Sequence, residues 1–354
     1  EANKQLDLYV AEVENGMIAE GKMMTFAKFT EMWAKDYGTK ELAPKTYARY
    51  KGMLDSRILP YFGNYKITEI KPTHIINFYD FLSSEHQIKR CKGNAGARIQ
   101  KPLSSKTILE HHRLIRAMLQ KAVYWQLIVS NPMARIQAPK SKKPKINYYD
   151  EDECKQLFVA LENEKIKYQT IVLLTLFTGT RRGEVVGMDW TDIDFNNQFI
   201  NIDKSNQYLP DRGIYTKDPK TESGIRGIAI PKFVIETLKH YKTWYEEQKE
   251  LYGDLWFDSN KLFVQKDGKP MQPDTVTRWF KRFIEKNNLP PITFHGLRHT
   301  NATLLISQNI DIAVVSSRLG HAQITTTLNF YVHPVKSHNK LAGEVLEKLL
   351  LSKN

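Results

Sequence analysis

Apolar positions in the first third of the chain recur every three or four residues, which is the spacing of amphipathic helices. This period predicts helices over residues 25–37, 45–59, 73–82 and 105–125. Thr73 and Ser104 or Ser105 are suited to cap the last two, because their side-chain oxygens accept hydrogen bonds from unpaired backbone amides. Asn131-Pro132 follows the fourth helix and prevents it from continuing. We therefore expect an all-α domain over residues 24–135.

The rest of the chain mixes two periods. Residues 150–161 predict an amphipathic helix, and residues 168–177 are almost wholly apolar, which predicts a buried helix ended by Gly179. Residues 195–203 and 225–230 alternate as strands and are joined by a long polar loop. Further helices are expected from Pro231, Asp274, His295, Ile312 and Thr325. Residues 148–354 are thus predicted to form a mixed α+β domain, mainly helical with a small antiparallel sheet.

The segments between and around these domains are polar or charged. Residues 136–147 carry two prolines and four lysines, which predicts an extended basic linker. Residues 85–101 are polar, basic and contain glycine, so they form either a loop along a nucleic-acid backbone or an ordinary surface loop. Residues 1–23 begin without Met and predict a connecting helix. The tail from Asn339 to Leu350 has an apolar stripe, which suits packing on another subunit or on its own domain.

Positive charge is concentrated in one part of the chain. The net charge is +13, but residues 45–146 hold 20 Lys and Arg against 5 Asp and Glu. Such an imbalance favours a phosphate-binding surface over a merely solvated one. We expect contacts to double-stranded DNA from Lys45, Arg49, Lys51, Lys106, Arg113, Arg116, Lys140, Lys142, Lys143 and Arg182.

Composition excludes several other classes. No run of about 18 apolar residues is present, and the chain does not open on a signal peptide, so no membrane partner is expected. The two cysteines, Cys91 and Cys154, lie far apart without ligands at metal spacing. This pattern predicts neither a disulfide framework nor a zinc site and fits a cytoplasmic protein.

Residues suited to phosphodiester chemistry occur in four short motifs. Arg181 follows a Thr-Gly-Thr turn, and Glu184 lies one helical turn on, where it can orient or neutralise an arginine. His295, Arg298 and His299 are spaced to share a helix face. His321 and Tyr331 follow. Two histidines four residues apart can also bind metal, but an arginine between them would repel a cation, so we expect no metal site.

These motifs, in this order, resemble those of the tyrosine recombinase (phage integrase) family, most closely the integrases of conjugative transposons. The family has two spacings for its nucleophile. One would fall on Phe330, which has no hydroxyl, and the other falls on Tyr331. The resemblance implies that Tyr331 attacks a DNA phosphate and forms a 3′-phosphotyrosine. It also implies that Lys220, or Lys217 as the weaker candidate, protonates the leaving oxygen.

The resemblance implies further roles for the other motif residues. Arg181 and Arg298 would clamp the phosphate, His321 would donate a hydrogen bond to it, and His295 would accept the phenol proton. Glu184 and His299 would support them. Because the phosphotyrosine conserves the bond energy, the reaction requires no cofactor.

The implied architecture is a C-shaped clamp around DNA, with a helical core-binding domain opposite the catalytic domain. A homotetramer on two duplexes would form by exchange of C-terminal helices, with accessory excision and DNA-bending proteins as further partners in a bacterial nucleoid. Residues 1–23 would then be the remnant of a connection to a missing arm-binding domain. One alternative is a DNA-binding or architectural protein that is catalytically inactive. The other is an enzyme that uses the same chemistry as a dimer resolvase, an invertase or a type IB topoisomerase.

Overall fold

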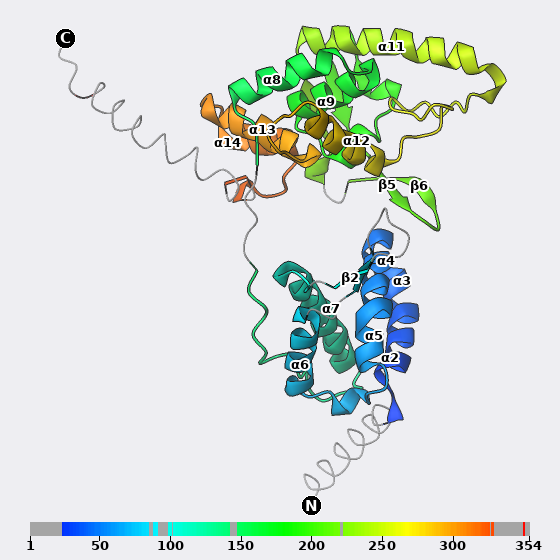
Figure 1. The fold of residues 1–354 in the computed structure, drawn as a ribbon, viewed down its shortest axis with the longest axis vertical. Helices are drawn as coiled ribbons and strands as arrows, with labels where there is room; N and C mark the ends of the chain where they lie inside the picture. The colour runs from blue at the N-terminus through cyan, green and yellow to red at the C-terminus, as the bar shows by residue number, and fades with distance from the viewer. Residues whose placement is uncertain are drawn as a thin grey trace, which may run out of the picture. The chain divides into compact units, whose positions relative to one another are not determined.

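The computed structural model describes residues 23–84, 88–90, 98–100, 102–141, 147–219, 222–325, 327–328 and 350. The chain divides into two compact units, Glu1–Pro144 and Lys145–Asn354. Each unit encloses its own apolar core, and the two are described separately (Figure 1).

Unit 1 is built mainly from helices. Its α-helices are α2 (Phe26–Trp33), α3 (Thr39–Glu41), α4 (Pro44–Met53), α5 (Leu59–Phe62), α6 (Pro72–Ser83) and α7 (Ser105–Tyr124). Two π-helical turns, η1 (Ala34–Gly38) and η2 (Leu54–Ile58), continue α2 and α4, and η3 (Ile67–Glu69) is a 3₁₀ turn. The two short strands β1 (Ile88–Arg90) and β2 (Arg98–Gln100) pair antiparallel.

The predicted helices of unit 1 are confirmed, because their apolar stripes form its core. Phe26, Phe29 and Trp33 are buried on α2, and Ile108, Ile115 and Leu119 are buried on α7. The Ser104 side chain caps α7 by accepting from the amide of Thr107, as predicted.

Two local predictions in unit 1 were wrong. Thr73 does not cap α6, because Pro72 already occupies the first turn and Lys71 is the residue that precedes it. The stretch 85–101, expected to be a loop, contains the β1–β2 ribbon. Its short strands lack the alternation of apolar residues by which a strand is recognised in sequence.

Unit 2 combines seven α-helices and two small sheets among its described residues. The helices are α8 (Glu151–Glu162), α9 (Ile166–Thr178), α10 (Arg182–Val185), α11 (Lys232–Tyr252), α12 (Pro273–Lys286), α13 (Phe294–Ser307) and α14 (Ile312–Leu319). Strands β3 (Ile193–Asp194), β4 (Phe199–Ile202) and β7 (Arg226–Ala229) form an antiparallel sheet in the order β3-β4-β7. Strands β5 (Ser205–Leu209) and β6 (Gly213–Lys217) form a hairpin. Short 3₁₀ turns are η4 (Trp190–Asp192), η5 (Glu222–Gly224) and η6 (Gly253–Leu255).

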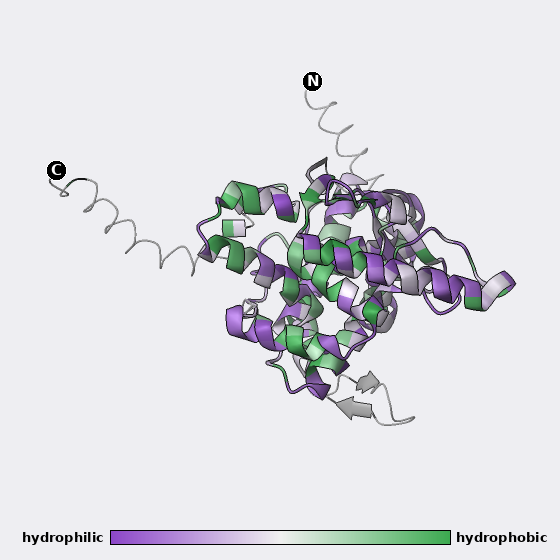
Figure 2. Cartoon of the chain, turned by 90° about the horizontal axis from the view of Figure 1, so that it is seen from above, coloured by the Kyte–Doolittle hydropathy of each residue, from purple (hydrophilic) through white to green (hydrophobic). Residues whose placement is uncertain are grey.

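The apolar helix α9 lies at the centre of unit 2, packed against α11 and α13 (Figure 1). Ile171, Val172 and Leu174 are fully buried there, as its sequence predicted. Helices in Figure 2 carry both green and purple residues, as amphipathic helices do. The result is a rigid central helix whose carboxyl end is fixed in the core.

The strand prediction in unit 2 was partly wrong. Residues 195–198 of the predicted strand 195–203 form a turn that joins β3 to β4, so the strand begins only at Phe199. The polar loop expected between the two strands contains the β5–β6 hairpin. Its strands carry polar residues on both faces, so the period of two is hidden in the sequence.

The described residues contain no helix that is both long and apolar enough to cross a membrane. Cys154 is buried in unit 2, and burial raises the pKa of its thiol to about 11, so the thiol is not a reactive nucleophile. Cys91 lies outside the described residues.

Gly179 provides a direct test of how α9 ends. It adopts φ +65°, and an added Cβ would lie 2.6 Å from Leu319 and 2.9 Å from the side chain of Asn301. We predict that Gly179→Ala destabilises α9 by about 1–2 kcal/mol through backbone strain and by about 1–3 kcal/mol more through overpacking. Native-state hydrogen exchange of the α9 amides measures this loss.

Gly213→Ala is the matched control for Gly179→Ala. Gly213 has φ +70° in the same unit, but an added Cβ meets nothing within 4 Å, so only the backbone cost is expected. Equal losses for the two variants would show that Leu319 and Asn301 do not confine this turn.

Candidate active site

Arg181 is positioned by a helix end and by an acid. Helix α9 ends at the left-handed Gly179, and Arg181 then precedes the short helix α10. The backbone N–H of Arg181 donates to Glu184 Oε2 at 2.9 Å, and its Nη1 donates to Oε1 at 2.7 Å. The Arg181 side chain is 41% exposed, whereas that of Glu184 is 9% exposed. A buried carboxylate therefore orients a guanidinium that is open to solvent.

Arg298 comes from α13 and is buried. Its Nη1 donates to the carbonyl of Gly179 at 2.6 Å, and its Nη2 lies 2.7 Å from Nε2 of His321. Arg181 Nη2 in turn donates to the carbonyl of Gly320 at 3.1 Å. Each arginine therefore bonds to a glycine carbonyl at the end of a helix, and both guanidinium groups contact the Gly320–His321 segment.

His321 is held in one protonation state by its neighbours. It follows α14, which ends at the left-handed Gly320 as the sequence indicated. A guanidinium can only donate, so Nε2 accepts from Arg298, and the ring proton on Nδ1 is directed at the Thr327 hydroxyl 2.8 Å away. Burial, with Arg298 and Arg181, lowers the pKa of His321 to about 4. The imidazole is neutral near pH 7.

His295 and His299 form a second pair on α13. Their ring centroids lie 4.9 Å apart at 88°, an edge-to-face contact. Burial lowers the pKa of His295, and Arg298 lowers it further. Burial and then His295 lower the pKa of His299 to about 4. A neutral imidazole at the more exposed His295 is able to accept a proton.

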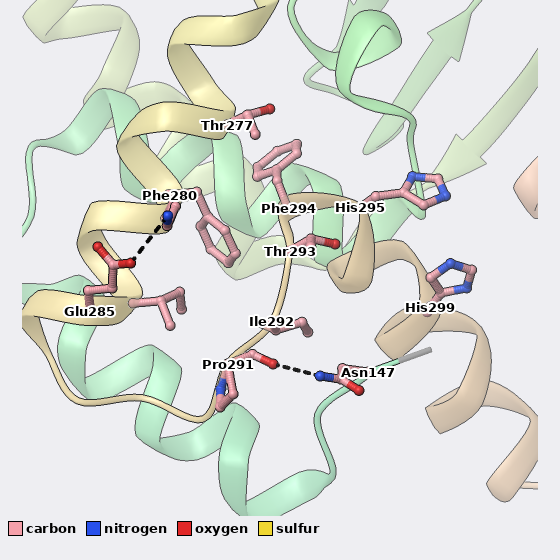
Figure 3. Close-up of a pocket in the computed structure, with 12 residues that line it drawn as sticks. Asn147, Thr277, Phe280, Glu285, Pro291, Ile292, Thr293, Phe294, His295 and His299 are labelled. Atoms are coloured by element: carbon pink, nitrogen blue, oxygen red, sulfur yellow. Dashed lines mark hydrogen bonds and ion pairs between the residues drawn. The ribbon is translucent and has the colours of Figure 1, made fainter. Parts of the chain in front are cut away.

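A pocket of about 530 Å³ lies beside these two histidines (Figure 3). Phe280, Ile292 and Phe294 give it apolar walls, and the Asn147 amide donates to the carbonyl of Pro291 at 3.0 Å across its rim. Apolar walls do not suit a phosphate. The phosphate-binding candidates are instead Arg181, Arg298 and His321.

The remaining predicted catalytic residues are not in the described part of the chain. Lys220 lies outside it, between β6 and η5, and Tyr331 lies beyond residue 328. Lys217, the weaker lysine candidate, is the last residue of β6. No group of three or more His, Cys, Asp or Glu side chains that could hold a metal ion occurs in the described segments.

The structure places the predicted DNA-contact residues on several elements. Lys45, Arg49 and Lys51 are exposed on α4, and Lys106, Arg113 and Arg116 are exposed on α7. Arg49 and Arg113 both pair with Glu110 at 2.9 Å, which ties α4 to α7 and brings their basic residues onto a common surface.

The linker residues and Arg182 are placed differently. Lys140 is exposed, and Lys142 and Lys143 lie outside the described residues. Arg182 is partly buried and pairs with Asp274 at 2.8 Å and with the Thr277 hydroxyl at 2.7 Å. In this structure Arg182 therefore connects α10 to α12.

Arg226 is a site residue that the sequence reasoning missed. It begins β7, its side chain is 5% exposed, and it donates to Glu184 Oε2 at 2.7 Å. Burial alone would raise the pKa of Glu184, but Arg226 and then Arg181 outweigh burial and lower it. The available signal was strand alternation, which puts Arg226 on the same face as the buried Ile228.

Sequence profiles match both units. The profile of the phage integrase family matches residues 147–338, and that of the phage integrase N-terminal SAM-like domain matches residues 25–83. The chain belongs to the phage integrase family, the tyrosine recombinases, and is a site-specific recombinase.

Curated relatives are similar over most of the chain. A XerC-like tyrosine recombinase of Caldanaerobacter subterraneus subsp. tengcongensis is 25% identical over 99% of this chain and 90% of its own length. The ICEBs1 integrase of Bacillus subtilis is 26% identical over 87% of this chain and 78% of its own. The transposase from transposon Tn916 of Enterococcus faecalis is 26% identical over 91% and 77%.

Solved structures share the fold. The Tn1549 transposon integrase in complex with a circular intermediate DNA aligns with a TM-score of 0.72 at 20% identity, over 90% of this chain and 99% of that one. A lambda integrase dimer bound to a core site aligns with a TM-score of 0.61 at 19% identity, over 87% and 95%. The expected fold class, a helical domain joined to a mainly helical catalytic domain with small antiparallel sheets, is confirmed.

The two pKa values near 4 lead to a prediction on acid stability. His299 and His321 bind fewer protons in the folded protein than in the unfolded one. Their contribution to the free energy of unfolding is therefore present above about pH 6.5 and is lost as the pH falls toward about 4. We predict that His321→Gln reduces the acid-induced fall in melting temperature, measured by calorimetry from pH 7.5 to 4.5. His240→Gln, on the exposed face of α11, is the control; an identical acid response in all three proteins would contradict the prediction.

Proposed function

We propose that this recombinase excises and integrates a mobile element. The observation that carries the proposal is the meeting of Arg181, Arg298 and His321 at two helix ends. Two guanidiniums neutralise the non-bridging oxygens of a phosphate and stabilise the charge of its pentacoordinate state. The likeness to relatives named as an integrase of ICEBs1 and a transposase of Tn916 supports a role in element movement.

In the proposed reaction, the Tyr331 oxygen bonds to phosphorus while the bond from phosphorus to the 5′-oxygen breaks. His295 takes the phenol proton, and Lys220 gives a proton to the leaving 5′-oxygen. Attack by a 5′-hydroxyl from another duplex reverses these transfers and releases Tyr331. The number of phosphoester bonds is unchanged in each step, so the reaction requires no external energy source.

His321 must change its hydrogen bond when a phosphate enters. Its Nε2 now accepts from Arg298, and a phosphate oxygen between the two would accept from Arg298 in its place. The negative charge of the phosphate also favours a protonated imidazole, which then donates from Nε2. Glu184 keeps Arg181 oriented throughout, and His299 supports His295.

We further propose residues 24–135 as the core-binding domain and residues 148–354 as the catalytic domain, joined by a basic linker over residues 136–147. The basic surface of α4 and α7, with Lys140, Lys142 and Lys143, would contact the backbone of double-stranded DNA. In unit 2, Arg182 would contact DNA only by releasing Asp274. Such a protein works at the bacterial nucleoid, with excision and DNA-bending proteins as further partners.

The chemistry predicts a specific pattern of variant activities. With a nicked suicide duplex that carries the element's recombination site, the wild-type chain should form a covalent protein–DNA product. Tyr331→Phe should form none, because no hydroxyl remains to attack. Arg298→Lys should lower the cleavage rate on the order of a few hundredfold, about 3–4 kcal/mol, because one preorganised donor is lost.

Tyr124→Phe is the matched control, because Tyr124 is exposed at the end of α7 in unit 1. It should cleave as fast as the wild type. If Tyr331→Phe still forms the covalent product, the assigned nucleophile is wrong. If the wild-type chain binds the site without forming the product, the protein is the silent DNA-binding alternative.

Strand exchange separates the remaining alternatives. A type IB topoisomerase relaxes supercoiled DNA and reseals the same strands, whereas a recombinase joins strands from two sites. Two labelled duplexes that yield recombinant product support the recombinase. A resolvase or invertase would require its sites in a fixed orientation on one molecule.

The tail is proposed to link protomers by helix exchange. Deletion of residues 339–354 should abolish higher-order complexes on two duplexes while leaving first-strand cleavage of a suicide substrate measurable. Analytical ultracentrifugation with DNA gives the assembly, and the covalent product gives the cleavage. If the truncated chain assembles like the full chain, the tail packs on its own domain.

A further inference from the structure

The buried side chain of Arg226 uses each of its nitrogens as a donor. Nη2 donates to Glu184 Oε2 at 2.7 Å, Nε to the carbonyl of Arg318 at 2.8 Å, and Nη1 to the carbonyl of Gly224 at 3.1 Å. A guanidinium is the side chain suited to this task, because its donors point in fixed, divergent directions. One side chain thus connects three separate parts of unit 2.

Two of those parts hold a proposed catalytic group, and the third follows Lys220 in the sequence. Glu184 orients Arg181. Arg318 is in the last turn of α14, two residues before Gly320 and three before His321. Gly224 ends η5, the turn that follows Lys220. Arg226 therefore lies behind the phosphate-binding candidates and bonds to the segments that hold them.

The packing around Arg226 is close. A Cβ added to Gly320 would lie 2.8 Å from Arg226 Nη1 and 3.0 Å from the carbonyl oxygen of Ser223. The left-handed turn that delivers His321 is therefore seated directly on the Arg226 guanidinium. A shift of Arg226 would move this turn as well as Glu184.

We propose that Arg226 is a positioning residue that holds Arg181 and His321 in their relative places for attack on the phosphate. This inference rests on the proposed function, because it assigns Arg226 a part in the same reaction. Arg226 acts through Glu184 and through backbone carbonyls, so its loss should affect the chemical step more than DNA binding.

A second consequence concerns the charge of Glu184. Arg226 and Arg181 together hold the pKa of this buried carboxyl below its usual range. Without Arg226, burial is opposed by Arg181 alone, so the pKa rises and Glu184 becomes protonated at higher pH. A protonated Glu184 holds Arg181 less firmly. As the pH is lowered, the variant should therefore lose cleavage activity at a higher pH than the wild type does.

The other charged or titratable groups near Glu184 belong to several elements. The carboxylate faces Arg181 beside α10 and Arg226 on β7. His295 and Arg298 on α13, and His321 after α14, lie close enough to interact with these groups. Because the histidines also titrate, an effect of Glu184 must be separated from theirs by a variant that cannot titrate at position 184.

The test measures covalent-product formation by Arg226→Met and Arg226→Lys. At saturating DNA the cleavage rate should fall by about ten- to a hundredfold, the effect of a displacement of about 1 Å in a positioned group. The DNA concentration for half-saturation should stay within about twofold of the wild type. In a plot of cleavage rate against pH, the fall of the rate on the acid side (the acid limb) should move to higher pH in Arg226→Met.

Arg318→Met is the matched control. Arg318 is another partly buried arginine of unit 2, whose Nη2 donates to the carbonyls of Phe177 and Ala229. It is expected to lower the melting temperature without moving the acid limb. Glu184→Gln combined with Arg226→Met should cleave no faster than Arg226→Met alone, because a neutral glutamine holds Arg181 less firmly than a carboxylate. It should also lose the displaced acid limb, because glutamine does not titrate.

The outcomes separate the two proposals. A wild-type chain that forms no covalent product contradicts the proposed function. A wild-type chain that cleaves, with Arg226 variants that match its rate and pH profile, overturns the role of Arg226 alone. If Arg226→Met does not fold, Arg226→Lys decides: wild-type cleavage by this variant shows that the three-way contact is not required.

Discussion

The candidate site depends on the ends of two helices and on the arginines that bond to them. Gly179 and Gly320 are both left-handed, so each turns the chain sharply and presents a carbonyl inward. Arg298 donates to the first carbonyl and Arg181 to the second. Arg298 bonds beside Arg181, and Arg181 bonds beside His321, which also contacts Arg298, so hydrogen bonds link the two corners. Two groups 117 residues apart in the chain (181 and 298) are fixed in this way.

The core explains why these corners are rigid. Helix α9 is apolar along its length and packs between α11 and α13, so its end at Gly179 is anchored by buried side chains. Helix α13 brings Arg298 toward that end and carries His295 and His299 on the same helix. The burial that stabilises unit 2 also removes water from the imidazoles. This is why their pKa values are lowered, which leaves them neutral, as the proposed role of His295 as a proton acceptor requires.

Much of this architecture could be predicted from sequence because its helices are amphipathic or wholly apolar. The end of α9 and the corner before His321 were also predictable, since glycine adopts the left-handed conformation readily. The β5–β6 hairpin was not, because its strands lack an apolar face. The role of Arg226 was also hidden: its partner Glu184 is 42 residues away, and only the folded chain brings them together. Roles for Lys220 and Tyr331 still rest on the resemblance and remain predictions.

The contact between Arg298 and His321 determines how the resting site meets an anion. Arg298 already donates to a carbonyl and to an imidazole, so a phosphate oxygen that takes the place of the His321 ring exchanges with a partner that is already bonded. A small anion in solution makes few other contacts that could offset the loss of the hydrogen bond between Arg298 and His321. A phosphate held within a long duplex gains many other contacts at the same time, so the exchange favours polymeric DNA over the abundant free phosphates of a cell.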